Sequence, residues 1–389
     1  WYQRAIGVVL PLSGRYAPFG ELVKQGIDLA VKNSTAPIQV IYQDSGADPQ
    51  AAADAVRRLV RAQRVMAVVG PLTGDAAMLA VQEAEKAQVP IITLSYRDGL
   101  PQLGNYVFRN SLTPQQQVEA LADYAIEELG LNTYAILYPD NRMGEQYAQL
   151  FRQAIEFRGG DIEHQRSYGE SSTDFRRQLL LLKGEDPDAP QDVEPEVVAE
   201  DEDALVVEEE EIPGLPNVDF EGLFIPDYAD SVALIAPQIA YYGIENVQLF
   251  GINGWNSPQM IEQAGRYVRG SIICDGFFAQ SPDVAVKRFV ESYQQMYGDT
   301  PSILEAQGYD SIRLLFSLLA DQDMITPQQL QHRLYQVKGF NGVTGLQGFD
   351  QQGEAQRDLF MLKFGRKQLW QVRGLPEPLP AVKQLPIFE

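Results

Sequence analysis

The feature that most constrains this chain is the regular alternation of short apolar runs with longer amphipathic stretches. The run Ala5–Leu10 is apolar throughout, as expected for a parallel strand that is buried on both faces. A helix-like stretch follows at Glu21–Lys32, then a strand-like run at Ile38–Tyr42 and a second helix-like stretch at Pro49–Ala62. This order predicts an α/β fold with a doubly wound parallel sheet, because parallel strands need crossover connections between them.

The same rhythm begins again after residue 115. A helix is predicted at Gln115–Leu129, a strand at Tyr134–Tyr138 and a helix at Glu145–Phe157. The chain has 389 residues, which exceeds the size that one hydrophobic core usually supports. We therefore expect two similar lobes, each with its own parallel sheet.

The supply of reactive residues excludes several classes of function. Cys274 is the only cysteine, so neither an internal disulfide nor a Cys-rich zinc site can form. His164 and His332 are the only histidines, which makes a histidine-based metal centre or a Ser-His-Asp triad improbable; we expect no metal and no cofactor. The net charge of −22 argues against a nucleic-acid partner. No apolar run reaches the 18 residues of a membrane span.

Much of the negative charge lies in one segment. Residues 185–211 contain 14 of the 53 acidic residues and neither lysine nor arginine. Such a segment cannot bury enough apolar surface to offset its ordering entropy, so we predict a disordered surface loop. It is either a solubilising insertion or a docking site for a basic partner or cations. The tail at 373–389 contains four prolines and is predicted to be extended and irregular.

No catalytic signature is present, since G-x-G-x-x-G, P-loop, G-x-S-x-G and H-E-x-x-H patterns are all absent. An enzyme is therefore the least supported class. In open α/β sheets, ligands bind beyond the carboxyl ends of the strands. That rule selects the loops Pro11–Gly20, Gly70–Asp75, Ser95–Gly99, Pro139–Gly144 and Gly251–Ser257, together with the turn Pro226–Ala229.

Two of these positions leave alternatives open. Gly70-Pro71-Leu72-Thr73-Gly74 is either a tight strand-to-helix turn or a cluster of backbone N–H groups suited to an anion. Asp44, at the end of a predicted strand, either caps a turn or helix or contacts a ligand.

Several short motifs occur in the order typical of one known family. The chain opens with Gly7-Val8-Val9-Leu10-Pro11-Leu12-Ser13-Gly14, and Val69-Gly70-Pro71, Val89-Pro90-Ile91-Ile92, Phe108-Arg109 and Tyr309-Asp310 follow. The chain thereby resembles type I periplasmic binding proteins, above all the branched-chain amino-acid and amide (Leu/Ile/Val-binding) family of ABC transporters. The resemblance spans almost the whole chain except the acidic segment and the tail.

The resemblance implies two Rossmann-like lobes joined by three hinge crossings, closing like jaws on a ligand that is delivered to an ABC-transporter permease. The crossings are expected near Asn110–Thr113, Asp275–Ala279 and Lys338–Val343. Residues 1–111 with 278–338 would form the N-terminal lobe, and residues 112–277 with 339–372 the C-terminal lobe. The implied location is periplasmic or extracellular, with a lipid anchor outside this chain as one means of attachment.

The resemblance also implies which residues bind the ligand. Thr73 and Gly74 match the turn that holds a ligand carboxylate, Ser95, Tyr96 and Arg97 occupy the next loop, and Phe19 matches a covering aromatic. On the second lobe, Met143 and Tyr228 match cleft positions. Asn253 stands where the family has an acid for the ligand ammonium, and Asp227 could supply that charge. Trp255 would stack on the ligand, and Arg15 and Tyr309 complete the set. Since Arg97 adds a cation and Asn253 removes an anion, we expect a small polar, amino-acid-like or carboxylate ligand.

A second family of the same fold is also similar. The phrase Leu10-Pro11-Leu12-Ser13-Gly14-Arg15-Tyr16-Ala17-Pro18-Phe19-Gly20 resembles the lipoprotein activators of penicillin-binding proteins. That resemblance implies a regulator of peptidoglycan synthesis whose partner is a peptidoglycan synthase.

Overall fold

The computed structural model describes residues 2–188, 215–320 and 326–373. Most of the predicted acidic loop and the proline-rich tail from residue 374 lie outside these residues. The chain divides into two compact units. Unit 1 contains residues 2–113, 275–360 and 371–373, and unit 2 contains residues 114–274 and 361–370.

Unit 1 contains a parallel sheet of five strands in the order β2-β1-β3-β4-β5. Its strands are β1 (Ala5–Leu10), β2 (Gln39–Asp44), β3 (Ala67–Val69), β4 (Ile91–Thr93) and β5 (Val107–Arg109). Its α-helices are α1 (Ala17–Lys32), α2 (Pro49–Arg61), α3 (Gly74–Ala87), α9 (Val284–Tyr297), α10 (Ile303–Ala320) and α11 (Pro327–Gln336). This order of elements confirms the predicted doubly wound α/β fold.

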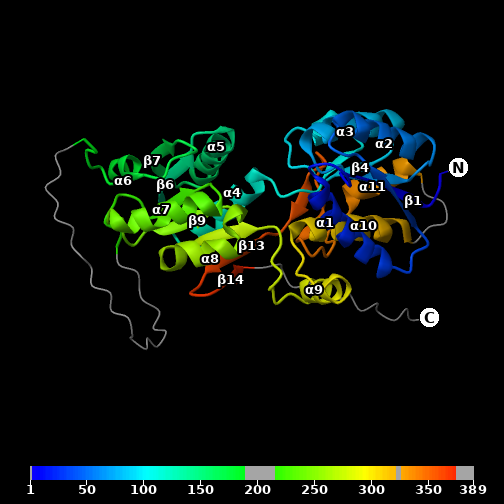
Figure 1. Cartoon of the computed structure of the whole chain (residues 1–389). Helices are drawn as coiled ribbons and strands as arrows, with labels where there is room; N and C mark the ends of the chain where they lie inside the picture. The colour runs from blue at the N-terminus through cyan, green and yellow to red at the C-terminus, as the bar shows by residue number, and fades with distance from the viewer. Residues whose placement is uncertain (1, 189–214, 321–325, 374–389) are drawn as a thin grey trace, which may run out of the picture. The chain divides into compact units, whose positions relative to one another are not determined.

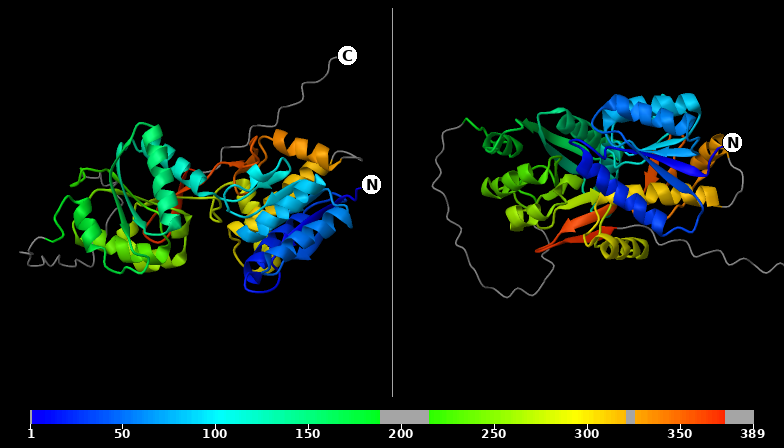
Figure 2. Two further views of the ribbon diagram at one scale, coloured as in Figure 1. Left: turned by 90° about the horizontal axis from the view of Figure 1, so that it is seen from above. Right: turned by 45° about the vertical axis from the view of Figure 1, so that its right-hand side comes forward.

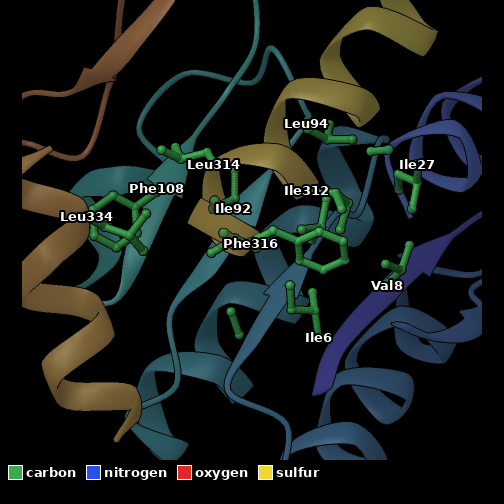
Figure 3. Packing of buried hydrophobic residues seen from close by; sticks show 14 of the residues in the cluster. Ile6, Val8, Ile27, Ile92, Leu94, Phe108, Ile312, Leu314, Phe316 and Leu334 are labelled. Carbon is green, nitrogen blue, oxygen red and sulfur yellow. The ribbon is translucent and has the colours of Figure 1, made fainter. Parts of the chain in front are cut away.

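Two apolar clusters form the core of unit 1, one on each face of the sheet. Alternate side chains of β1 supply both, because successive residues of a strand point to opposite faces. Ile6, Val8 and Leu10 pack towards α1, α10 and α11, while Ala5 and Val9 pack towards α2 and α3. Figure 3 shows the first of these clusters. In Figures 1 and 2, α1 and α10 lie on the opposite face of the sheet from α2 and α3.

Unit 2 contains a sheet in the order β14-β13-β10-β9-β8-β6-β7, in which the pairs from β10 to β7 are parallel. Its strands are β6 (Thr133–Pro139), β7 (Asp161–Tyr168), β8 (Gly222–Ile225), β9 (Gln248–Gly251), β10 (Ile272–Asp275), β13 (Phe360–Phe364) and β14 (Leu369–Arg373). Its α-helices are α4 (Pro114–Asp123), α5 (Arg142–Phe157), α6 (Arg176–Leu182), α7 (Ala229–Tyr241) and α8 (Pro258–Ala264). Aromatic packing joins α5 to this sheet, since the rings of Phe151 and Phe224 stack with centroids 4.2 Å apart.

The chain changes from one unit to the other at 113/114, at 274/275, at 360/361 and, within β14, at 370/371. The first two changes fall in or beside the segments where crossings are expected. Residues 339–360, however, lie in unit 1, whereas the sequence placed them in the C-terminal lobe. The hairpin of β11 (Leu346–Phe349) and β12 (Ala355–Arg357) explains the difference, because it packs against unit 1. The Phe349 ring lies 5.1 Å from that of Phe108.

Candidate functional site

The loops that follow the parallel strands carry most of the candidate residues, and each unit is described separately. In unit 1, Thr73 is the N-cap residue of α3, and within the described part of the chain its hydroxyl makes no capping hydrogen bond. The first N–H groups of a helix have no partner within the helix and lie at the positive end of its dipole. Thr73 and Gly74 thus present a hydroxyl and backbone N–H groups at a helix start, as an anion site requires.

Arg97 lies against this helix start. A Cβ atom built on Gly74 would be 3.2 Å from Arg97 Cδ, so the side chain passes directly over that glycine. Its guanidinium forms an ion pair with Asp75, with Nη1 and Oδ1 separated by 2.6 Å. The structure therefore places a cation and backbone donors together on one side of unit 1.

Ser95 supports the loop instead of facing solvent. The residue is fully buried, and its Oγ accepts a hydrogen bond from the Arg97 backbone N–H at 3.2 Å. Its carbonyl oxygen accepts one from the Ser111 hydroxyl at 3.0 Å. A direct contact between Ser95 and a ligand therefore stays a prediction, and in this structure the residue acts as an acceptor within the loop. Tyr96, the next residue, is 74% exposed.

Arg109, at the end of β5, is a buried residue to which the sequence assigned no role. Its Nε and Nη2 donate to the two carboxylate oxygens of Glu354, each at 2.7 Å. Its Nη1 donates to the carbonyl oxygens of Tyr96 at 3.1 Å and Arg97 at 2.6 Å. The motif Phe108-Arg109 was recognised only as a family mark, and no local pattern links it to a residue 245 positions away.

The β1–α1 loop carries Arg15 and Phe19. The Arg15 guanidinium lies 4.6 Å from the ring centroid of Tyr16, and Phe19 in the first turn of α1 is 50% exposed. Asp44 fastens this loop, because its Oδ1 accepts from the backbone N–H groups of Leu12 at 2.8 Å and Gly46 at 2.7 Å. Burial alone would raise the pKa of Asp44, but the hydrogen bonds that its carboxylate accepts hold the pKa below its ordinary value.

In unit 2, Tyr228 and Asp227 lie between β8 and α7. Tyr228 is the N-cap residue of α7, is 58% exposed and covers Gly254, where an added Cβ atom would be 2.7 Å from Tyr228 Cδ1. Asp227 is buried, and its carboxylate accepts from the Tyr168 hydroxyl and the Tyr228 backbone N–H, both at 2.7 Å. Burial and then the bond to Asp227 raise the pKa of Tyr168, so its phenol remains a donor.

Trp255 and Asn253 occupy the turn after β9. Trp255 is fully buried, its indole N–H donates to the Ile225 carbonyl oxygen at 3.2 Å, and its ring fills the space beside Gly251. The prediction that Trp255 forms a ligand wall is therefore wrong, because glycine at 251 lets the indole enter the core. The Asn253 backbone N–H donates to Gln117 Oε1 at 2.9 Å, and its side chain is half-buried.

The two remaining candidates take different positions. Met143 is half-buried in the first turn of α5, beside the capping residue Asn141. Tyr309 lies within α10, where its ring centroid is 4.6 Å from that of Phe289 and 5.2 Å from the Arg313 guanidinium carbon. Tyr309 thus packs between helices of unit 1, whereas Thr73, Gly74 and Arg97 are brought together at one loop cluster.

Two further properties limit the chemistry. Across residues 2–188, 215–320 and 326–373, no three His, Cys, Asp or Glu side chains are grouped so as to hold a metal ion. In the same residues, no helix has both the length and the apolar character needed to cross a bilayer. The arrangement provides hydrogen-bond donors, a guanidinium and exposed aromatic rings, which are suited to binding.

Sequence comparison gives several relatives. A Leu/Ile/Val-binding protein homologue of Brucella melitensis is 28% identical over 188 residues, covering 46% of this chain and 50% of that protein. The penicillin-binding protein activator LpoA of Pasteurella multocida is 27% identical over 147 residues, covering 38% of this chain and 24% of that protein. The glutamate receptor 2.7 of Arabidopsis thaliana is 29% identical over 160 residues, or 39% of this chain and 16% of the receptor. The chain therefore spans half or less of the length of these curated relatives.

Solved structures match over nearly the full chain. A candidate branched-chain amino acid ABC transporter protein of Rhodospirillum rubrum has a TM-score of 0.82 at 21% identity, covering 95% of this chain and 99% of that one. LivJ of Streptococcus pneumoniae, a branched-chain amino acid substrate-binding protein in complex with isoleucine, has a TM-score of 0.63 at 25% identity, covering 94% and 97%. A solute-binding protein of Rhodopseudomonas palustris with 3,4-dihydroxybenzoic acid has a TM-score of 0.63 at 20% identity, covering 92% of each chain.

The family profile extends this likeness to the sequence itself. The periplasmic binding protein profile matches residues 4–368, which is nearly the whole chain. The parallel sheets flanked by helices are those of the type I periplasmic binding protein fold, and the family and its structural neighbours are solute-binding proteins and not enzymes. The chain belongs to the periplasmic binding protein family.

Proposed function

We propose that this protein binds a small carboxylate-bearing solute at its strand-end loops and delivers it to an ABC-transporter permease. The observation that carries the proposal is the cluster of Thr73, Gly74 and Arg97 at the start of α3. A carboxylate there would accept from the hydroxyl and the backbone N–H groups, and the guanidinium would compensate its charge. Family membership supports a solute-binding role.

The exposed aromatic residues favour a ligand that also has an apolar or planar part. Phe19 in the first turn of α1 and Tyr96 in the loop after β4 present exposed rings in unit 1, and Tyr228 does so in unit 2. Asp227 accepts two hydrogen bonds, and a carboxylate has about four acceptor sites, which leaves capacity for an ammonium group. We therefore propose an amino acid or an aromatic carboxylate as the ligand class.

A thermal-shift screen followed by calorimetry tests the ligand class. The probes are L-leucine, L-isoleucine, benzoate, 3,4-dihydroxybenzoate and succinate, applied after unfolding and refolding to remove any carried ligand. A ligand at about 1,000 times its dissociation constant stabilises the folded state by roughly 4 kcal/mol, which raises the melting temperature by several degrees. A flat response to all carboxylates would contradict the proposal.

A matched pair of threonine variants then tests the site. Thr326 caps α11 with its hydroxyl, which accepts from the Gln329 backbone N–H at 3.2 Å, whereas Thr73 makes no such bond. Thr326→Val should lower stability by about 1 kcal/mol and leave ligand affinity unchanged. Thr73→Val should have the opposite profile, with stability preserved and affinity for the bound carboxylate reduced about tenfold. Equal ligand affinity in the two variants would mean that the Thr73 hydroxyl does not contact the ligand.

We also propose a periplasmic or extracellular location, as the family implies, and ligand-induced closure by hinge motion. Closure is measurable as a smaller radius of gyration in solution scattering when the identified ligand is added. An unchanged radius at saturating ligand would contradict it.

A second candidate function rests on the relationship to LpoA. In this alternative the chain activates a penicillin-binding protein and its partner is a peptidoglycan synthase. The two functions are distinguished by combining the ligand screen with a binding assay against a purified peptidoglycan synthase. Saturable synthase binding with a flat ligand screen would favour the activator, and the reverse pattern would favour the solute-binding protein.

A further inference from the structure

The loop at residues 95–98 is held in place by hydrogen bonds from one buried side chain, that of Arg109. Arg109 donates to the carbonyl oxygens of Tyr96 and Arg97 and, at 3.3 Å, to Asp98 Oδ1. Three consecutive residues of the loop are thereby bound by one guanidinium. Since Arg109 is buried, these bonds are shielded from competing water.

The other side of Arg109 is held by a segment from the far end of the chain. Both oxygens of Glu354 accept from its guanidinium in a planar, bidentate pair. The Arg109 backbone N–H also donates to the Gly353 carbonyl oxygen at 2.8 Å. Asp350 stiffens this turn, because its Oδ1 accepts from the backbone N–H groups of Gln352 and Glu354, each at 2.9 Å.

These contacts determine where the guanidinium of Arg97 lies. The Arg97 backbone is fixed at both ends, since its N–H donates to Ser95 Oγ and its carbonyl oxygen accepts from Arg109. Its side chain lies at the start of α3, where the helix dipole is positive and a cation is disfavoured. A loosely held loop would let this long, 42%-exposed side chain turn away into solvent. The Asp75 carboxylate compensates the guanidinium there, and the fixed loop backbone keeps Arg97 within reach of both Asp75 and the helix start.

We propose that Arg109, buttressed by Glu354, is a positioning residue that holds the 95–98 loop so that Arg97 meets the anionic group of the ligand. This inference rests on the proposed carboxylate-binding function and adds to it the residue pair that preorganises the site. Arg109 acts through the loop backbone, because its own nitrogens are engaged by the loop and Glu354. A lysine at 109 carries the charge but cannot make the bidentate pair.

Unit 2 contains a matched control. Arg158 is also largely buried and donates to two carboxylates, Asp123 and Glu119, each at 2.6 Å, and to the Ala154 carbonyl oxygen at 2.9 Å. Its bonds resemble those of Arg109, but among the described residues its printed side-chain partners all lie on helices α4 and α5 and not on a candidate ligand loop. Arg158→Lys should therefore lower stability about as much as Arg109→Lys without an effect on binding.

The test compares Arg109→Lys, Glu354→Gln and Arg158→Lys in the full chain. Hydrogen exchange of peptides covering residues 94–99 measures the loop directly, and calorimetry with benzoate and benzamide, or leucine and leucinamide, measures the preference for a carboxylate. In Arg109→Lys we expect exchange at 95–98 to be about 10-fold faster and the preference for carboxylate over amide to fall about 10-fold. Glu354→Gln should show smaller changes of the same kind, and Arg158→Lys neither.

The outcomes separate this inference from the proposed function. Wild-type exchange at 95–98 in Arg109→Lys would overturn the positioning role, whatever the ligand. Faster exchange with an unchanged carboxylate preference would overturn the link from Arg109 through Arg97 to the ligand. If no probe binds the wild-type protein, the proposed function fails, while the exchange data still decide whether Arg109 holds the loop.

Discussion

The β1–α1 region of unit 1 and the β6–α5 region of unit 2 use the same local construction. In each, a strand ends at or just before a proline and a 16-residue helix follows, with a glycine in its first turns packed on that proline. A Cβ atom on Gly20 would be 2.1 Å from the Pro11 carbonyl oxygen, and one on Gly144 would be 2.1 Å from the Pro139 carbonyl oxygen. The same strand–proline–helix packing therefore occurs in both units. The two loops differ in the side chains that they present to solvent.

Those differences are chemical. The loop before α1 runs from Pro11 to Tyr16, carries Arg15 and provides no side-chain cap for the helix. The loop before α5 is short, and Asn141 caps the helix by accepting from the Gly144 backbone N–H at 2.8 Å. Unit 1 presents Arg15 and Arg97 at its loops, whereas unit 2 presents Tyr228, Met143 and the neutral Asn253 together with the exposed Arg142 at the start of α5. We propose that the start of α3 in unit 1, where Arg97 lies over Gly74, is suited to an anionic group, and that the exposed ring of Tyr228 in unit 2 is suited to an apolar group.

The largest expected effect is on stability and comes from substitutions that disrupt the packing shared by the two regions. Gly20→Ala and Gly144→Ala each force a methyl group against backbone, which cannot move away as a side-chain end can, and each should destabilise its unit by about 3 kcal/mol. Gly169→Ala is the control, because its nearest neighbour is the Ser172 hydroxyl at 3.3 Å. Urea unfolding measures all three. If one of the two were as stable as the control, the two regions would not share this packing constraint.

The next largest effect is on ligand affinity and tests whether Arg97 binds the anionic group of the ligand. Arg97→Gln removes the guanidinium of unit 1 and should weaken binding of a carboxylate probe about 10- to 100-fold, with little change in the melting temperature because the Arg97–Asp75 pair is exposed. Asn253→Asp adds an acid to unit 2, where it should favour a probe that carries an ammonium group. Calorimetry with leucine and with benzoate separates the two. Unchanged benzoate affinity in Arg97→Gln would contradict the charge assignment.

A smaller effect concerns the apolar contribution of unit 2. Tyr228→Phe keeps the exposed ring over Gly254 and should bind the identified ligand within about twofold of wild type, whereas Tyr228→Ala should lose roughly tenfold through the lost apolar contact. Calorimetric titration with the identified ligand measures the affinity of both variants. If Tyr228→Phe and Tyr228→Ala bound the ligand equally weakly, the hydroxyl and not the ring of Tyr228 would contribute to affinity.

The sequence predicts the scaffold better than the site, for a physical reason. Strand β1 has the predicted bounds, helix α2 begins at the predicted residue and helix α5 ends at the predicted residue, because continuous apolar burial or an amphipathic period is visible in the sequence. The β11–β12 hairpin was not predicted, since it is short and is held by the Asp350 turn and by contacts with Phe108 and Arg109 that are distant in sequence. Loop side chains are harder still. Trp255 is in the core because Gly251 leaves room for it.

The smallest expected effect is a pH-dependent shift of amide resonances. It distinguishes the loop held by the Asp44 carboxylate from the loop held by the Asn141 amide. Asp44, a titratable carboxylate, holds the β1–α1 loop, whereas the amide of Asn141 caps α5 and does not titrate. Since the pKa of Asp44 is lowered in the folded protein, its contribution is fully present above the ordinary pKa and is lost as the pH falls through the lowered value. The Leu12 and Gly46 amide resonances should therefore shift with an apparent pKa below 3.8, while the Gly144 resonance stays constant. Asp44→Asn should abolish the shift at Leu12 and Gly46. A Gly144 resonance that moved with the same pKa would mean that acid loosens the scaffold common to both regions, and not the one loop that a carboxylate holds.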